Sequence, residues 1–204
     1  MSAFVSRRRF TRAFYRQSSL VVAQRLLGCY LHREVNGVEL VGKIVETEAY
    51  GPNDEACHAF RGRTQRNAVM FGDGGYSYVY FTYGMHHCFN VTTSEEGTGE
   101  AVLIRAVEPV VGLEMMRQLR PKASREVDIA NGPGKLCQAF GLSRGDNGLD
   151  LIESQELFIT IGEALSADAI GVSTRIGISV AVDHPWRYYV KGSNYVSRGK
   201  PSGG

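Results

Sequence analysis

Residues 29–50 read CYLHREVNGVELVGKIVETEAY, and this stretch predicts the β-hairpin on which the fold class depends. Asn36-Gly37 is a strong signal for a two-residue hairpin turn, because both central positions of such a turn need positive φ angles. Strand-forming residues lie on either side of it, over 29–34 and over 38–50. We therefore expect a short strand, a tight turn and a long antiparallel return strand.

The end of the return strand carries two acidic residues. Alternation along a strand places Glu46, Glu48 and Tyr50 on one face and the residues between them on the other. Acids on a strand face usually mark the solvent-exposed side of a half-covered sheet. Taken alone, this pattern favours surface charges over a functional site.

A second strand changes the interpretation of these acids. Residues 101–107 (AVLIRAV) are apolar on both faces except for Arg105, which is typical of a buried central strand. A buried guanidinium needs a carboxylate or carbonyl groups to offset its desolvation, and Glu48 is a natural candidate. Two interpretations stay open: a structural ion pair, or a carboxylate held ready for acid–base chemistry.

A second hairpin is predicted over residues 76–93, with Gly84 at its turn. Tyr76, Tyr78 and Tyr80 share one face of its first strand, as core aromatics commonly do. Tyr83 differs, because it sits beside the turn, where a large exposed ring is costly unless something receives it. A wedge that enters a stack of nucleic-acid bases is one such use.

The other predicted elements complete an α+β chain. They are a helix from Ser18 or Ser19 to Leu27, a helix that Pro109 opens and that ends near Pro121, a helix over 135–140, and short strands near 157–161, 176–182 and 187–190. We expect a single compact domain over 18–197 with a mainly antiparallel, curved sheet, flanking helices and a protruding hairpin. Residues 198–204 are expected to form a frayed tail.

Bulk composition excludes several classes of protein. The chain has 204 residues, which suits one domain, and it contains no run of 18 apolar residues and no signal-peptide pattern at its start. Four widely separated cysteines indicate reduced thiols, so we expect a cytoplasmic protein, associated with the nucleoid if its source is bacterial. Adjacent His86 and His87 face opposite ways on a strand, and the other histidines lack ligand spacing, so no metal site is predicted.

Basic residues concentrate in two stretches. The first acid is Glu34, and five arginines lie within residues 1–17. That arm fits a solvated, flexible tail, an organellar transit peptide or a segment that contacts nucleic acid. The loop over 61–67 (RGRTQRN) suits phosphate contacts but equally suits a plain solvated loop. Composition alone leaves these alternatives open.

Short motifs follow one another along most of the chain. In order they are ETEAYGP (46–52), DEACH (54–58), RN (66–67), MFG (70–72), YVY (78–80), YGM (83–85), CFN (88–90), VLIRAVEP (102–109), GPGKLC (132–137) and YYVKGS (188–193). Each motif is weak alone, but the collinear series resembles the alkyladenine (3-methyladenine) DNA glycosylase family over residues 18–197. The segment between Tyr50 and Gly51 is one residue shorter than in some relatives, so its loop geometry is less defined.

This resemblance implies a catalytic group and its surroundings. It implies that Glu48 deprotonates the attacking water, and that Arg105 and the backbone carbonyl of Ile176 help to hold that water. The remaining implied roles concern the base and the DNA. Tyr50, His58 and Tyr80 would sandwich the flipped base, Asn90 would screen its exocyclic groups, Tyr83 would fill the gap in the duplex, and Arg63, Met85 and Lys135 would contact the DNA backbone.

The resemblance implies a monofunctional DNA glycosylase of base excision repair. Such an enzyme flips alkylated or deaminated purines out of duplex DNA and hydrolyses the glycosidic bond, here without metal or nucleotide cofactor and as a monomer. Three alternatives stay open. They are a non-catalytic module that binds damaged DNA, a metal-dependent hydrolase that uses Glu46, Glu48 and His58, and a structural or interaction protein.

Overall fold

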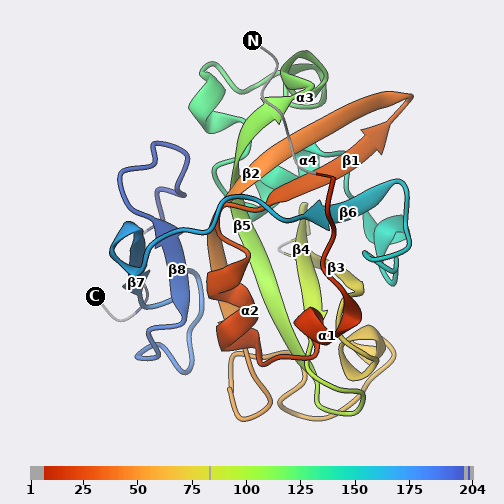
Figure 1. The fold of residues 1–204 in the computed structure, drawn as a ribbon. Coiled ribbons are helices and arrows are strands. Elements are labelled where there is room, and N and C mark those ends of the chain that lie inside the picture. Colours follow the sequence, from red (N-terminus) through yellow and green to blue (C-terminus); the bar gives the residue numbers. More distant parts are fainter. Residues whose placement is uncertain (1–6, 83, 200–201, 203–204) are drawn as a thin grey trace.

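The computed structural model describes residues 7–82, 84–199 and 202. It shows one domain built on a curved eight-stranded sheet, ordered β3-β4-β5-β2-β1-β6, with β8 pairing both β2 and β7 (Figure 1). All of these strand pairs are antiparallel. The α+β class and the mainly antiparallel sheet predicted from the sequence are confirmed.

The first predicted hairpin forms the middle of this sheet. β1 (Tyr30–Val35) and β2 (Val38–Tyr50) pair across Asn36 and Gly37, whose φ angles are 52° and 76°. These positive angles are the ones that a type I′ turn requires. β2 is long enough to pair with β1 near its start and with β8 (Arg187–Val190) near its end.

β5 (Glu100–Val111) lies between β4 and β2, so the predicted central strand is confirmed. It runs further than expected, because Pro109 belongs to the strand, and the helix begins only at α3 (Leu113–Leu119). The register between β2 and β5 shifts beside Pro109, which is paired with Gly42. Proline is tolerated at such an irregularity because its missing N–H need not join the ladder. Gly112, with a φ of 76°, then turns the chain into α3.

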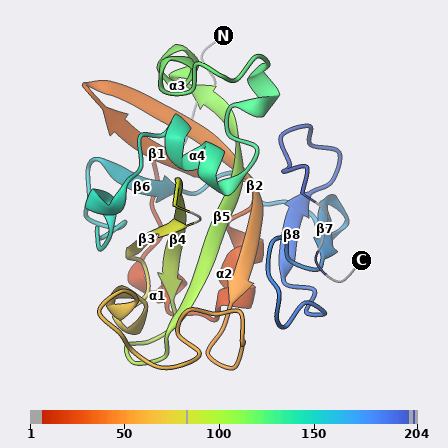
Figure 2. The ribbon, with the colours of Figure 1, turned by 180° about the vertical axis from the view of Figure 1, so that it is seen from behind.

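The second predicted hairpin is also present. β3 (Ser77–Thr82) pairs along its whole length with β4 (His86–Thr93), and residues Asn90–Thr93 of β4 also pair with β5. Tyr83, which the sequence predicts beside the turn, lies outside the described residues. Helices cover both faces of the sheet, because α2 (Ser19–Arg25) packs on β2 and β5 while α4 (Pro133–Ala139) packs on β4 and β5 from behind (Figure 2).

The last third of the chain differs in part from the prediction. β6 (Leu157–Thr160) and β8 form as expected, but residues 176–182 are not a strand, and β7 (Ile170–Ser173) lies earlier in the chain. The apolar pattern of 176–182 was misleading because its backbone curls around a buried guanidinium. Gly177 and Ala181 have φ angles of 77° and 50°, which no strand accommodates.

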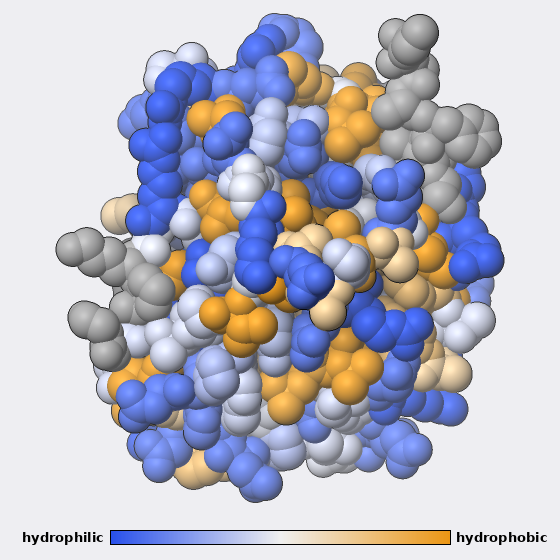
Figure 3. Space-filling view, turned by 60° about the vertical axis from the view of Figure 1, so that its left-hand side comes forward, coloured by the Kyte–Doolittle hydropathy of each residue, from blue (hydrophilic) through white to orange (hydrophobic). Residues whose placement is uncertain are grey.

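Short 3₁₀ turns connect the main elements. They span Ala68–Phe71, Glu126–Asp128, Arg144–Asp146 and Ala167–Ala169. On the side of the molecule that Figure 3 shows, hydrophobic and hydrophilic surfaces are interspersed. Val172 on β7 and Val180 after it are among the exposed large hydrophobic residues. Within the described residues, no helix has the length and apolar character that a membrane span requires.

The described part of the predicted N-terminal arm, residues 7–17, is folded into the domain. α1 (Arg12–Tyr15) buries Phe14 and Tyr15 in the main core together with Phe10. Its arginines are engaged by acids of the domain: Arg7 pairs with Glu39, Arg12 with Asp150 and Arg16 with Asp73. Of the alternatives for this arm, a solvated, flexible tail does not describe residues 7–17, because three buried rings hold the segment against the core and carboxylates of the domain offset the charge of three of its arginines.

Candidate active site

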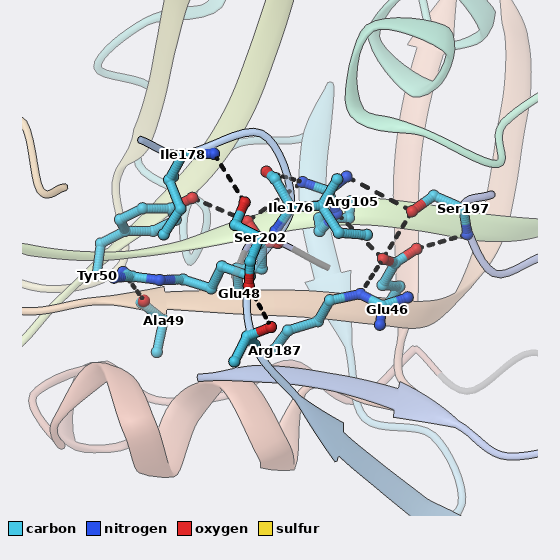
Figure 4. Close-up of polar contacts among 12 residues, drawn as sticks. Glu46, Glu48, Ala49, Tyr50, Arg105, Ile176, Ile178, Arg187, Ser197 and Ser202 are labelled. Atoms are coloured by element: carbon cyan, nitrogen blue, oxygen red, sulfur yellow. Dashed lines mark hydrogen bonds and ion pairs between the residues drawn. The ribbon is translucent and has the colours of Figure 1, made fainter. Parts of the chain in front are cut away.

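The predicted pair of Glu48 and Arg105 forms in the centre of the sheet. Nη1 of Arg105 on β5 lies 3.2 Å from Oε2 of Glu48 on β2. Glu48 is fully buried and Arg105 is 6% exposed. The face of β2 that carries Glu46 and Glu48, which the sequence pattern alone suggested would be exposed to solvent, is therefore covered. The cover comes from the segment after β7 and from the residues that follow β8 (Figure 4).

Glu48 accepts hydrogen bonds from groups on three segments. Tyr50 Oη donates to Oε2 at 2.8 Å, and the backbone N–H of Ile176 donates to Oε1 at 2.8 Å. Together with Arg105, these donors stabilise the negative charge of the carboxylate. Burial, with the nearby charge of Glu48, raises the pKa of Tyr50 well above its usual value, so the phenol remains a donor.

Arg105 faces both the carboxylate and the backbone of Ile176. Its Nη1 donates to the Ile176 carbonyl oxygen at 3.5 Å, on the same side as Glu48. Burial by itself would lower the pKa of Arg105, but the charges of Glu48 and Glu46 outweigh it and raise that pKa. Arg105 is therefore a fixed cation, and it meets Glu48 and Ile176 at one point of the structure.

The four residues predicted to contact the base line one pocket. They are Tyr50, His58, Tyr80 and Asn90, joined by Ala56, Met70, Tyr78 and Ala101. Tyr50 connects this pocket to Glu48, since its hydroxyl binds the carboxylate. Ile176, whose carbonyl is predicted to hold the water, lies beside Glu48 and Arg105. The pocket is thus an aromatic-walled hollow next to a buried carboxylate.

The walls of the pocket are held by hydrogen bonds. Nδ1 of His58 lies 2.8 Å from Tyr78 Oη, and the side-chain amide of Asn90 donates to the Tyr78 carbonyl at 3.0 Å. The rings of His58 and Tyr80 meet edge to face, with centroids 4.5 Å apart. These contacts fix the orientation of three aromatic rings before any ligand enters.

The aromatic walls are uncharged at neutral pH. Burial, and then the charge of Arg66, lower the pKa of His58 from its usual value. Burial also raises the pKa of Tyr78 to about 12 and that of Tyr80 further. A neutral imidazole beside neutral phenols favours a flat aromatic guest through stacking.

The residues expected at the DNA backbone lie away from the pocket. Arg63 is exposed in the loop after His58, and Met85 is 67% exposed beside the β3–β4 turn. Lys135, on α4, donates through Nζ to Asn131 at 2.7 Å. Phe81, on the same hairpin as Met85, is 44% exposed, so this hairpin carries apolar side chains on its surface.

The sequence did not predict the second buried ion pair of this region. Arg175 and Asp54 are both fully buried, and Nη2 of Arg175 lies 2.8 Å from Oδ1 of Asp54 while Nη1 contacts Oδ2. The guanidinium also lies over the rings of Tyr50 and Trp186, at 4.6 and 5.1 Å from their centroids. The guanidinium therefore supports the part of the pocket wall that Tyr50 forms. No local pattern could reveal it, because the partners are 121 residues apart in the chain.

Glu46 is the other residue whose place the sequence did not reveal. It is fully buried and contacts Arg105, Arg187 and Ser197. With the pairs described above, the site holds three carboxylates and three guanidiniums: Glu46, Glu48 and Asp54 with Arg105, Arg175 and Arg187. The buried charges therefore balance.

Among the described residues, no group of three or more His, Cys, Asp or Glu side chains is arranged to hold a metal ion. All three residues that a metal-dependent hydrolase would use have other partners. Glu46 is engaged by two arginines, Glu48 by Arg105, and His58 is hydrogen-bonded to Tyr78.

Comparisons with known proteins agree along nearly the whole chain. Residues 13–194 match the family model described as "Methylpurine-DNA glycosylase (MPG)". A protein of Carboxydothermus hydrogenoformans named "Putative 3-methyladenine DNA glycosylase" is 54% identical over 187 residues, which are 92% of this chain and 97% of that protein. Proteins with the same name from Francisella tularensis and Methanoculleus marisnigri are 46% and 49% identical, each over 91% of this chain and 97% of their own length.

Proposed function

The chain belongs to the methylpurine-DNA glycosylase family, and on this premise we propose that it is a monofunctional glycosylase that hydrolyses damaged purines from duplex DNA. The family acts in DNA repair on N-glycosyl bonds. One observation carries the finer proposal: Glu48 is a buried carboxylate, oriented by three donors, at the edge of an aromatic pocket. The balance of charge in the site supports an anionic Glu48 that can act as a general base.

The proposed reaction begins with a purine rotated out of the duplex into the pocket. Unpairing costs a few kcal/mol, and less for a damaged base, while stacking on Tyr50 and Tyr80 offsets about 1–3 kcal/mol per ring. Stacking recognises a flat ring without regard to its exact substituents. This supports a substrate class of several altered purines, with Asn90 positioned at the pocket wall to screen their exocyclic groups.

Glu48 then takes a proton from a water as that water attacks the sugar carbon C1′. Arg105 and the Ile176 carbonyl flank the carboxylate and would hold the water in place. As the glycosidic bond breaks, the sugar gains oxocarbenium character, which the anion stabilises. The bonding electrons leave with the purine, and the product is an abasic site.

The leaving group determines whether a proton donor is needed. An N-alkylated purine such as 3-methyladenine already carries positive charge and departs without one. A neutral base such as hypoxanthine or ethenoadenine needs protonation. Among the residues that line the pocket there is no lysine to form a Schiff base, which supports hydrolysis without strand cleavage.

An excision panel tests this function. We expect release of base from duplexes that carry hypoxanthine, ethenoadenine or 3-methyladenine, undiminished by EDTA, with strand breaks only after alkali. An undamaged duplex of the same sequence is the control. Binding of damaged duplex without base release would instead indicate a non-catalytic module. Activity that EDTA removes and added metal restores would indicate a metal-dependent hydrolase.

We also propose that Tyr83 fills the space that the flipped base leaves, a role that its place between β3 and β4 supports. The expected result for Tyr83→Ala is weaker binding of hypoxanthine-containing duplex and slower excision from it, because no ring stabilises the opened stack. Excision from the same lesion in a single strand should change much less. Equal losses on both substrates would contradict a role in flipping.

A further inference from the structure

Glu46 gathers donors from three separate parts of the chain. Its Oε1 accepts from Nε of Arg105 at 3.1 Å, from Nε of Arg187 at 2.7 Å and from Ser197 Oγ at 2.7 Å, and its Oε2 accepts from the Ser197 backbone N–H at 2.7 Å. These partners belong to β5, to β8 and to the segment that follows β8. A fully buried carboxylate with so many charged and neutral donors is a fixed point of the structure.

Arg105 is shared between the two glutamates by different nitrogen atoms. Glu46 takes Nε, while Nη1 lies 3.2 Å from Glu48 and 3.5 Å from the Ile176 carbonyl. Figure 4 shows Arg105 between Glu46 and Ser197 on one side and Glu48 and Ile176 on the other. A guanidinium is planar and rigid, so a contact that fixes Nε also fixes the direction of Nη1.

We infer that Glu46 is a positioning residue: by holding Nε, it aims Nη1 of Arg105 at the place of the attacking water and prevents the guanidinium from pairing with Glu48 through Nε and a terminal nitrogen together. This inference rests on the proposed function, in which Glu48 is the base. Without Glu46, Arg105 keeps its longer contacts with the Ile176 carbonyl and Ser197 Oγ, both 3.5 Å, and these oppose only weakly a bidentate pair with Glu48, the geometry that guanidinium and carboxylate favour. Such a pair would occupy the lone pairs that the water needs.

Glu46 also contributes a negative charge beside Arg105. Burial alone would raise the pKa of Glu46, but Arg105 and Arg187 outweigh burial and lower it, so Glu46 is an anion at neutral pH. Its negative charge partly offsets the charges of these two guanidiniums. Glu48 also faces Tyr50, Tyr80, Cys88 and Arg175. The variants below leave those groups unchanged. A difference between their pH profiles of excision therefore reports on Glu46 and its partner Arg187.

The test is the pH dependence of excision by two variants with opposite changes in charge. Methylated duplex DNA is the substrate, because its cationic purines leave without a proton donor. The acid limb of the pH–rate profile then reports on the general base, Glu48. In Glu46→Gln, loss of a negative charge should move the acid limb to lower pH by about one unit and slow excision about 10- to 100-fold. In Arg187→Gln, loss of a positive charge should move that limb to higher pH.

Glu114→Gln is the matched control, because it removes an exposed charge on α3 and should leave rate and profile unchanged. If Glu46→Gln and Arg187→Gln lower the excision rate equally at every pH, Glu46 and Arg187 have only a structural role. The inference then fails, while the proposed glycosylase function stands. An inactive wild-type protein would instead overturn the proposed function.

A milder variant covers the case in which the charge changes prevent folding. Ser197→Ala removes the hydroxyl that donates to Glu46 and that lies 3.5 Å from Nη2 of Arg105, with no change in charge. We expect a several-fold slower excision, an unmoved acid limb and unchanged lesion binding. An excision rate equal to that of the wild type would contradict the positioning role.

Discussion

We expect the Glu48→Gln variant to lose excision of damaged purines by about 10²- to 10⁴-fold while still binding the lesion duplex. The side chain keeps its size, so the pocket formed by Tyr50 and its neighbours remains open. An amide cannot take the proton of the attacking water, however, and it no longer carries the charge that stabilises the developing oxocarbenium ion. The loss should therefore fall on the chemical step.

Single-turnover excision of hypoxanthine and gel-shift binding of the same duplex separate the two effects. Thermal unfolding of the variant is measured alongside, because the new amide N–H₂ faces donors such as the Ile176 N–H and introduces a local conflict. Glu114→Gln serves as the comparison for an uncharged substitution at an exposed site. Excision at the wild-type rate by folded Glu48→Gln would mean that another group activates the water.

The largest expected effect on stability belongs to Asp54→Asn. Asp54 and Arg175 are both fully buried, so no solvent screens their interaction. Removing the carboxylate charge leaves Arg175 buried and uncompensated, at a cost of about 3–5 kcal/mol in the free energy of unfolding. Denaturant unfolding of the wild type and the variant measures this difference directly.

Two further variants sharpen that measurement. Glu114→Gln breaks an exposed pair with Arg117 and should cost at most about 1 kcal/mol. The double variant Asp54→Asn/Arg175→Met removes both charges and should recover part of the lost stability, because no unpaired charge is then buried. A loss below about 1 kcal/mol in Asp54→Asn would contradict the view that this pair braces the domain.

Asp54→Asn should also weaken lesion binding. The guanidinium of Arg175 lies over the ring of Tyr50, and Arg175 directly precedes Ile176 in the chain, so its movement is expected to displace both a pocket wall and the donor to Glu48. The expected result is a higher dissociation constant for lesion duplex in protein that is still folded.

Local sequence patterns predicted most of the sheet. The turn at Asn36-Gly37 and the break at Gly84 determined two hairpins, because glycine and asparagine supply backbone angles that other residues avoid. The uninterrupted apolar run around Arg105 predicted the central strand. Local patterns failed at Pro109 and over 176–182. In the first case a register shift tolerates proline inside a strand. In the second, Arg175 just before the segment donates to the Ala181 carbonyl and pairs with Asp54, which lies 121 residues away in the chain.

The buried pair of Glu48 and Arg105 was partly visible in the sequence. A lone arginine in an apolar strand demands a carboxylate, and that physical requirement pointed from Arg105 to Glu48. The requirement could not distinguish Glu48 from Glu46, and both in fact contact Arg105. Only the resemblance of the surrounding motifs separated their roles. The part that Glu46 plays became visible only with the positions of Arg187 and Ser197 known.

The sequence by itself determined the antiparallel hairpins, the buried strand and the need for a carboxylate beside Arg105, because turn chemistry and the cost of burying a charge are properties of short segments. Only the tertiary structure decided which acids are buried, how Arg105 is shared and that Asp54 pairs with Arg175. These contacts join distant residues, from Glu48 and Arg105, which are 105 − 48 = 57 positions apart, to Glu46 and Ser197, which are 151 positions apart. Their partners are chosen by the packing of whole strands and loops, which no local pattern records.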